Sequence, residues 1–423
     1  MTVPEAHRAV DAVWRLESAR IIAGLARIVR NIDLAEDLAQ DALLAALRQW
    51  PREGIPPNPG AWLMATAKHR AIDRLRRDER LQRNLGHLGR ELQARQETAA
   101  FDGGPEFDED LVPDDLLRLM FVACHPVLST ESRVALTLRL PGGLTTDEIA
   151  RAFLAAEPAI AQRIVRAKRT LASKQIPFEV PPAGERAARM ASVLEVIYLI
   201  FNEGYTATAG DNWARPELCY EALRLGRMLA ELSPTDPEVH GLVALMEIQS
   251  SRMRARLGPG GEPVPLLEQN RGNWDQLLIR RGFAALLRAE QLGGPPGSYV
   301  VQAAIAACHA RARTAAETDW PRIAALYEIL TVISPTPVVE LNRAVAVAMA
   351  FGPARGLDLV DALRSQPELR NYHLLPTVRG DLLAKLGRPA EARAEFERAA
   401  ALTRNVREQA VLRRRAAECP PGP

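Results

Sequence analysis

One stretch, GGLTTDEIARAFLAAEPAIAQRIVRAKRTL at residues 142–171, decides much of the fold. Thr145 and Glu148 have the T-x-x-E spacing of a capping box, which predicts that a helix begins there. A short turn follows, and Pro158 suits the first turn of a second helix. The stretch therefore predicts two helices joined by a tight connection.

The second of these helices is predicted to be amphipathic and basic. Its apolar stripe consists of Ile160, Ile164, Ala167 and Leu171. Residues 159–174 hold five Lys or Arg and no acid. The polar side carries Gln162, Arg163, Arg166 and Arg169, with Lys168 beside them. Because Arg and Gln can pair with base edges in the major groove, this pattern predicts a DNA-reading helix-turn-helix. An ordinary helical hairpin is the alternative.

A second basic helix is predicted in GAWLMATAKHRAIDRLRRDER, residues 60–80. Arg70, Arg74 and Arg77 are spaced as one ridge of a helix. Between residues 62 and 83 there are seven Lys or Arg against three acids, a local excess of +4. Such a ridge suits phosphate contacts, although a solvated helix face is equally compatible with the charges. The side expected to bury carries Ala65, Ile72 and Leu75.

Trp62 lies near the start of this helix and allows two interpretations. It can be a core residue, or it can shape a pocket for an unstacked base.

Upstream, NIDLAEDLAQDALLAALRQW at residues 31–50 predicts an amphipathic helix with two distinct faces. The face expected to bury carries Ala35, Leu38, Ala42 and Ala46. The other face mixes acids, an amide and an apolar side chain, and consists of Asp37, Gln40, Asp41 and Leu44. It is either a docking surface for a basic partner or a solvated face with one stray leucine.

Composition predicts an all-α protein. Of the 423 residues, 47% are hydrophobic and 25% charged, and no convincing strand pattern occurs. The net charge is only +2, so a nucleic-acid role depends on local segregation of charge. We expect no secretory signal, no membrane span and no catalytic motif.

The four cysteines are scattered without CxxC spacing, which argues against a disulfide framework. The pairs Cys124–His125 and Cys308–His309 cannot direct both side chains to one metal from a helix, so we expect no metal site and no cofactor.

Stretches rich in proline, glycine or acidic residues divide the chain into predicted parts. The first covers residues 1–96, followed by a linker at 97–115 that holds eight acids and no Lys or Arg and is expected to be solvated. A second unit covers 112–176, and a long helical region covers 186–423.

The C-terminal region carries signs of helical repeats. GDLLAKLGRPAEARAEFERAAAL at 380–402 is similar to a tetratricopeptide repeat, and Gly352 precedes Gly387 by 35 residues, close to the 34-residue period. LSPTDPE at 232–238 and ISPTPVV at 333–339 predict two similar helix ends. The stretch 259–274 is expected to be an exposed loop, and an irregular helical bundle is the alternative to repeats.

The three N-terminal motifs together resemble the bacterial RNA polymerase sigma factors of the extracytoplasmic-function (ECF) class, within the sigma-70 superfamily, over residues 10–175. The first motif resembles the segment that binds core polymerase, the second the −10 segment and the third the −35 helix-turn-helix. The long helical extension resembles a subgroup with tetratricopeptide-like repeats, and FNEGYTATAGDNWARPELCYEALRL at 201–225 resembles the same subgroup.

This resemblance implies roles for individual residues. Those implied to dock on the β′ clamp helices of the core enzyme are Asp37, Gln40, Asp41 and Leu44. Those implied to contact the −10 element are Trp62, Lys68, Arg70, Arg74, Arg76 and Arg77. Those implied to lie on the −35 helix are Gln162, Arg163, Arg166, Lys168 and Arg169.

The implied function is promoter recognition by a cytoplasmic, nucleoid-associated, non-enzymatic protein. Its partners would be core RNA polymerase (β′ clamp helices and β flap), promoter DNA, and a protein or peptide bound by the repeats. The alternative is a one-component DNA-binding regulator with a helical-repeat sensor domain, which would not need a unit that binds core polymerase.

Overall fold

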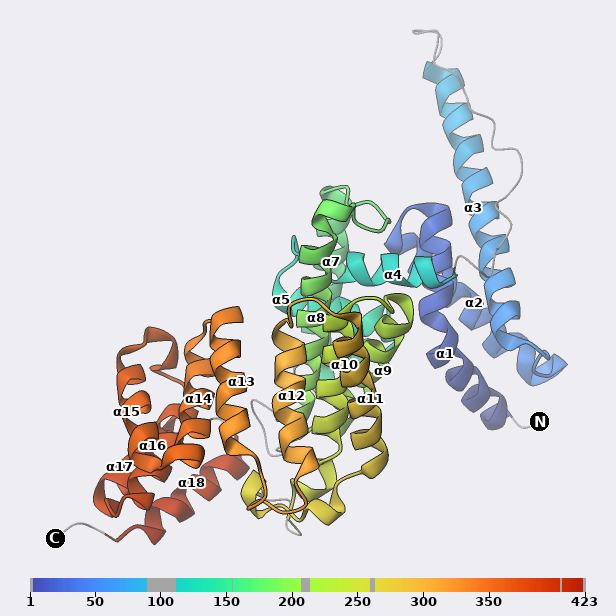
Figure 1. Ribbon diagram of the computed structural model, residues 1–423. Helices are drawn as coiled ribbons and strands as arrows, with labels where there is room; N and C mark the ends of the chain where they lie inside the picture. The colour runs from blue at the N-terminus through green and yellow to red at the C-terminus, as the bar shows by residue number, and fades with distance from the viewer. Residues whose placement is uncertain are drawn as a thin grey trace. The chain divides into compact units, whose positions relative to one another are not determined.

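The computed structural model describes residues 3–89, 112–153, 155–206, 214–258, 263–403 and 405–420, and these residues are almost entirely helical (Figure 1). Within these ranges no strand forms, and an isolated bridge joins Leu257 and Pro263. The predicted all-α fold is confirmed. The described residues contain no helix long and apolar enough to cross a membrane.

The chain divides into two compact units, Met1–Val196 and Ile197–Pro423. The helices of the first unit are α1 (Val3–Val29), α2 (Ile32–Glu53), α3 (Pro59–Gly89), α4 (Val112–Ala123), α5 (Thr130–Arg139), α6 (Thr146–Ala152), α7 (Glu157–Ser173) and the first part of α8 (Ala183–Tyr205). Helix α1 packs against α2, α3 and α4, and α7 packs against α5 and α6.

Helix α2 forms where the sequence predicts it. Asn31 caps its start by accepting a hydrogen bond from the Leu34 amide at 3.0 Å, and Gly54, with a φ of +90°, ends it. All four residues of the expected apolar face are buried, together with Glu36, Ala39, Ala45 and Trp50. The apolar stripe therefore sets the face that α2 presents to α1 and α3.

The apolar face of α3 differs by one position from the prediction. Ala65 is exposed, while Ile72 and Leu75 are half-buried. The buried residues are Leu63, Met64, Ala67 and Ala71. The prediction that Ala65 is buried was wrong. The buried row instead runs through Leu63, Ala67 and Ala71, which are spaced four residues apart along α3.

The predicted acidic linker falls mostly outside the described residues, but its last four residues, 112–115, begin α4. Asp115 lies in α4, is 2% exposed and pairs with Arg27 at 2.9 Å and Arg118 at 2.7 Å. The expectation that this carboxylate is solvated was wrong, because two arginines supply the partners that burial requires. Burial nevertheless raises the Asp115 pKa, since desolvation outweighs the attraction of these two cations.

Helix α8 bonds to the first unit through its N-terminal half. Arg189 donates to the carbonyl of Phe121 at 2.8 Å, and the Ser192 hydroxyl donates to the carbonyl of Cys124 at 2.6 Å. Arg133 donates to Glu195 at 2.8 Å. A chain cut at residue 186 would lose all three bonds.

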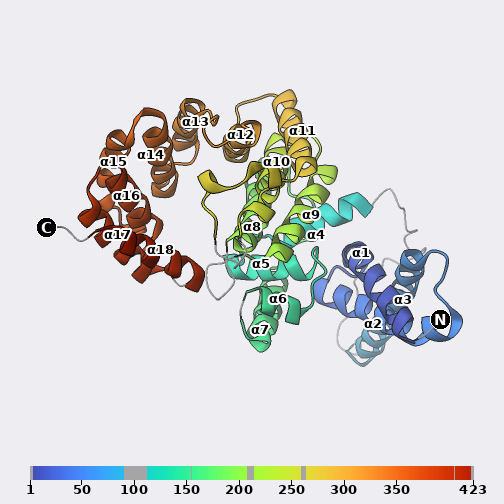
Figure 2. The ribbon, with the colours of Figure 1, turned by 90° about the horizontal axis from the view of Figure 1, so that it is seen from below.

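The helices of the second unit are the rest of α8, α9 (Pro216–Leu232), α10 (Pro237–Ser250), α11 (Gln276–Leu292), α12 (Ser298–Arg311), α13 (Trp320–Ile333), α14 (Pro337–Phe351), α15 (Pro353–Ala362), α16 (Leu374–Lys385), α17 (Pro389–Leu402) and α18 (Val406–Glu418). From α13 onward each helix lies beside the next along the chain (Figure 2).

The two predicted Ser-Pro helix ends have the same geometry. Ser233 ends α9 and Ser334 ends α13, each with a φ of −136°, and a proline begins the following helix in both cases. Gly352 and Gly387 have φ values of +102° and +71° at the turns before α15 and α17. Similar turns therefore recur, while the assignment to tetratricopeptide repeats stays a prediction.

The stretch 259–274 differs from its expected form. Residues 259–262 lie outside the described residues, but Gln269, Arg271 and Trp274 are each less than 10% exposed. The expectation of an exposed loop was wrong for this part, since Trp274 packs with Ala255 and Ile279 in a small core.

Candidate nucleic-acid interface

The polar face of α2 is open to solvent at the positions that sequence singled out. Asp37, Asp41 and Leu44 are exposed, Leu44 by 48%, and Gln40 is half-buried. Partial desolvation of its carboxylate raises the Asp37 pKa, and the nearby carboxylate of Asp33 raises it further. An exposed leucine between acids can bury against a partner that also supplies cations.

The arginine ridge of α3 adjoins this acidic face. Arg70 pairs with Asp41 at 3.5 Å, and Arg74 pairs with Asp78 at 3.3 Å. A hollow of about 490 Å³ is lined by Leu34, Asp37, Leu38, Asp41, Arg70, Arg74 and Arg77. Opposite charges thus meet along the α2–α3 edge, and Arg76 and Arg77 are exposed beside them.

Trp62 has a partner in the core but is not fully covered. Its ring meets that of buried Trp50 edge to face, with centroids 5.5 Å apart and planes at 68°. Trp62 itself is half-buried, as is Lys68. The exposed part of the Trp62 ring remains available for stacking.

Helices α6 and α7 form as predicted. The Thr145 hydroxyl accepts from the Glu148 amide at 3.1 Å, and the Glu148 carboxylate accepts from the Thr145 amide at 2.8 Å, which completes the capping box. The four stripe residues of α7 are all buried. Of its polar residues, Gln162, Arg166 and Arg169 are exposed and Arg163 is half-buried. Arg166 donates to Gln162 at 3.1 Å, so these two side chains form one polar patch.

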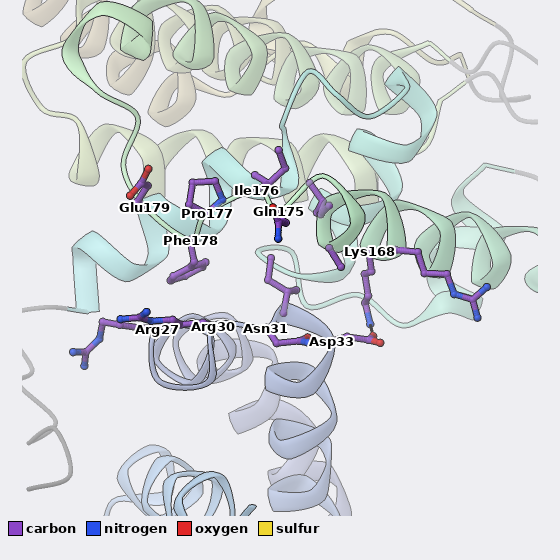
Figure 3. Close-up of a pocket in the computed structure, with 14 residues that line it drawn as sticks. Arg27, Arg30, Asn31, Asp33, Lys168, Gln175, Ile176, Pro177, Phe178 and Glu179 are labelled. Atoms are coloured by element: carbon purple, nitrogen blue, oxygen red, sulfur yellow. Dashed lines mark hydrogen bonds and ion pairs between the residues drawn. The ribbon is translucent and has the colours of Figure 1, made fainter. Parts of the chain in front are cut away.

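Lys168 differs from its neighbours on α7. Its side chain is 11% exposed and reaches α2, where it pairs with Asp33 at 2.7 Å (Figure 3). It also pairs with Glu36 at 2.5 Å. Burial alone would lower the Lys168 pKa, but Glu36 and Asp33 more than reverse this and raise it. Lys168 therefore binds α2 in this structure, and a DNA contact would require it to leave these carboxylates.

Glu36 is the centre of this contact between α2 and α7. It is 4% exposed, and its carboxylate also accepts from Arg139 at 2.6 Å and from Gln40 at 3.1 Å. Sequence patterning could not single out Glu36, because it lies among alanines on the face that buries and its cationic partners, Arg139 and Lys168, are more than 100 residues away.

A neighbouring pocket of about 790 Å³ lies between the start of α2 and the end of α7 (Figure 3). Arg30, Lys168 and Arg169 contribute cations to its lining, and Phe178 adds an aromatic ring. Arg30 and Gln175, both in the lining, are the non-glycine residues with positive φ in the described chain, each at +51°.

Comparison with known proteins agrees with this geometry. Residues 15–81, which include α2 and most of α3, match the sigma-70 region 2 family. Residues 189–290 match a family of unknown function (DUF6596). An uncharacterised protein of Rhizobium meliloti (strain 1021) is 43% identical over 408 residues, which cover 95% of each chain.

Residues 15–81 of the chain thus form a region that matches sigma-70 region 2. The chain belongs to the same family as the Rhizobium meliloti protein.

Proposed function

We propose that this protein is a sigma factor of the extracytoplasmic-function class, which binds core RNA polymerase and directs it to promoters in the cytoplasm. The match of residues 15–81 to sigma-70 region 2 carries the proposal, because it spans both the docking face of α2 and the arginine ridge of α3. The protein performs no covalent chemistry in this role. Binding energy alone would place the polymerase and capture the separated −10 strand.

The α2 face and the α3 ridge differ in chemistry, and we assign each a different partner. Asp37, Asp41 and Leu44 offer a mixed acidic and apolar face that suits the β′ clamp helices. The α3 ridge supplies cations for phosphates, and Trp62 at its start can stack on a base.

Helices α6 and α7 are proposed to read the −35 element as a helix-turn-helix. Support comes from the capped first helix, the buried stripe of the second and the exposed patch of Gln162, Arg166 and Arg169. A bidentate Arg or Gln contact distinguishes base pairs in the major groove.

The helical region after α8 is proposed to regulate the sigma unit as a set of tetratricopeptide-like repeats with a protein or peptide partner. Its covalent tether gives it a high effective concentration at the sigma unit. Stacked helical repeats also present extended binding surfaces.

In vitro transcription tests the whole proposal. Purified core polymerase and the full chain are added to a pooled promoter library, beside a chain that ends after Val196 and so keeps the α8 bonds to α4 and α5. Specific initiation by the full chain is expected, and a change in its level in the shorter chain would measure regulation. Failure of the full chain to bind core polymerase would overturn the sigma assignment and favour a one-component DNA-binding regulator.

Arg166→Ala is expected to weaken binding to −35 duplexes selectively. Loss of one bidentate base contact costs about 1–3 kcal/mol of discrimination, and only at the base pair that Arg166 reads. Affinities for a set of single-base −35 variants measure this. Arg151→Ala is the control, since Arg151 is exposed on α6 and pairs with Asp147. An equal loss on every −35 variant would argue against a reading role.

Asp37→Ala is expected to lower affinity for core polymerase about tenfold, because an exposed carboxylate loses its cationic partner in the complex. Binding to −35 duplex DNA should not change, since Asp37 lies on α2 and not on α7. Fluorescence titration with core enzyme gives the first value and duplex titration the second. Glu53→Ala, an exposed change at the end of α2, is the matched control.

A further inference from the structure

The second unit contains a small pocket that the proposed function leaves without a role. It has a volume of about 230 Å³ and lies between residues 252–256 and 263–269 on one side and helices α16 and α18 on the other. At about 30 Å³ for each water molecule, it has room for roughly eight waters, which suits a small metabolite. We call it the Arg252 pocket.

Cations gather on one wall of this pocket. Arg252 and Arg256 line it, and the Arg252 guanidinium lies 5.4 Å from the ring centroid of Trp274. Arg252 donates to Gln249 at 2.9 Å, while its buried Nε has no hydrogen-bond partner among the described residues. Within the described residues no carboxylate forms an ion pair with Arg252, so its charge is held against aromatic rings and an amide.

The positive charge of Arg252 acts on its surroundings. Burial lowers the pKa of Arg256 to about 10, and the Arg252 charge adds to this shift. Burial also lowers the His309 pKa to about 4, with Arg252 and Arg271 acting in the same direction. An anion on this wall would offset the mutual repulsion of Arg252 and Arg256.

Gln269 supplies a second, independent sign of a ligand. It lines the pocket, is 6% exposed, and donates through Nε2 to the carbonyl of Val264 at 2.9 Å. Its Oε1 is buried and has no hydrogen-bond partner in the described part of the chain. A buried acceptor left unsatisfied costs about 1–3 kcal/mol, which a ligand N–H or O–H would recover.

The remaining walls are mostly apolar. Val264 and Leu266 come from the loop, Leu374 from α16, and Val411 and Leu412 from α18. The carboxylate of Glu408, also in the lining, is held by His373 at 3.1 Å and by the Thr403 hydroxyl at 2.6 Å. Glu408 therefore has its own partners and does not neutralise the arginine wall.

We propose that the Arg252 pocket binds a small organic acid with an N–H or O–H donor next to its carboxylate, that is, an amino acid or a 2-hydroxy acid with an apolar side chain. The carboxylate would bind Arg252, and the donor would bind Oε1 of Gln269, while Arg256 stays bonded to Tyr205 and Thr206 and adds positive charge to the wall. The apolar side chain would pack against Leu374, Val411 and Leu412. This inference does not depend on the sigma assignment.

Calorimetric titration of the full chain tests the proposal. The probes are alanine, leucine and phenylalanine, the 2-hydroxy acid of each, isocaproate, leucinamide and inorganic phosphate. At least one amino or hydroxy acid should bind, while isocaproate, which lacks the donor, and leucinamide, which lacks the carboxylate, should bind at least tenfold more weakly. Binding by none of the acids, or equally tight binding of phosphate, would overturn the proposal.

Variants locate the site. Arg252→Gln should weaken binding at least tenfold, and Arg254→Gln should not, because Arg254 is exposed and lies outside this pocket. Val411→Phe fills the pocket without changing a charge and should also abolish binding, with circular dichroism confirming the fold of each variant. Unchanged binding in both Arg252→Gln and Val411→Phe would show that the ligand lies elsewhere and overturn the assignment.

Discussion

Replacing Glu36 by alanine is expected to destabilise the contact between α2 and α7 by about 3 kcal/mol. The substitution removes the buried carboxylate that pairs with Arg139 and Lys168, whose side chains are 21% and 11% exposed. Arg139 would then lose its carboxylate partner and Lys168 would keep only the exposed Asp33, and breaking a buried pair costs more than the pair contributes. Hydrogen exchange of peptides from α2 and α7, followed over a urea series, measures the local free energy of opening.

Asp33→Ala is the matched control for this prediction. Asp33 pairs with the same Lys168, but its side chain is 66% exposed. We therefore expect a loss below about 1 kcal/mol, as for other solvated ion pairs. Equal effects of the two substitutions would show that the burial of Glu36 does not matter and would contradict the prediction.

Gly241→Val is expected to destabilise the second unit by about 3 kcal/mol, at the upper end for overpacking. Gly241 lies in α10 where α12 crosses it. A Cβ atom there would be 2.6 Å from the backbone nitrogen of Val300 and 2.8 Å from its Cγ2. Because backbone cannot rotate away as a side chain can, α10 and α12 would have to separate. Thermal unfolding of the full chain, followed by circular dichroism, measures the loss.

Gly184→Ala provides the comparison. Nothing lies within 4 Å of the position that its Cβ would take. The change should be neutral or slightly stabilising, since alanine restricts the unfolded chain. A similar loss in both variants would show that steric contact at Gly241 is not the cause.

Features set by neighbouring residues could be predicted from the sequence. The Thr145–Glu148 capping box and the buried stripe of α7 depend on spacings of three and four residues, and both are confirmed. The two faces of α2 follow from the same helical period. Local hydrogen bonds and a single periodicity determine such features without reference to the rest of the fold.

Features set by distant partners could not be predicted. Asp115 reads as part of an acidic linker until Arg27, 88 residues away, is placed beside it. The helical period places Lys168 on the basic face of α7. Its side chain nevertheless pairs with Glu36, which is buried on α2. The exposed positions of the candidate site could be predicted from the sequence. The charge pairs that join its helices could not.

The order of packing from α13 to α18 has a consequence for how this end of the chain forms and comes apart. Each helix there contacts chiefly its neighbours in sequence, so chain segments need to close only short loops to meet. Such an array can grow from any nucleus by adding one helix at a time. Helix α18 packs chiefly on α17, so we expect it to open before the helices inside the array, and an early, limited protease cut before Val406 would show this.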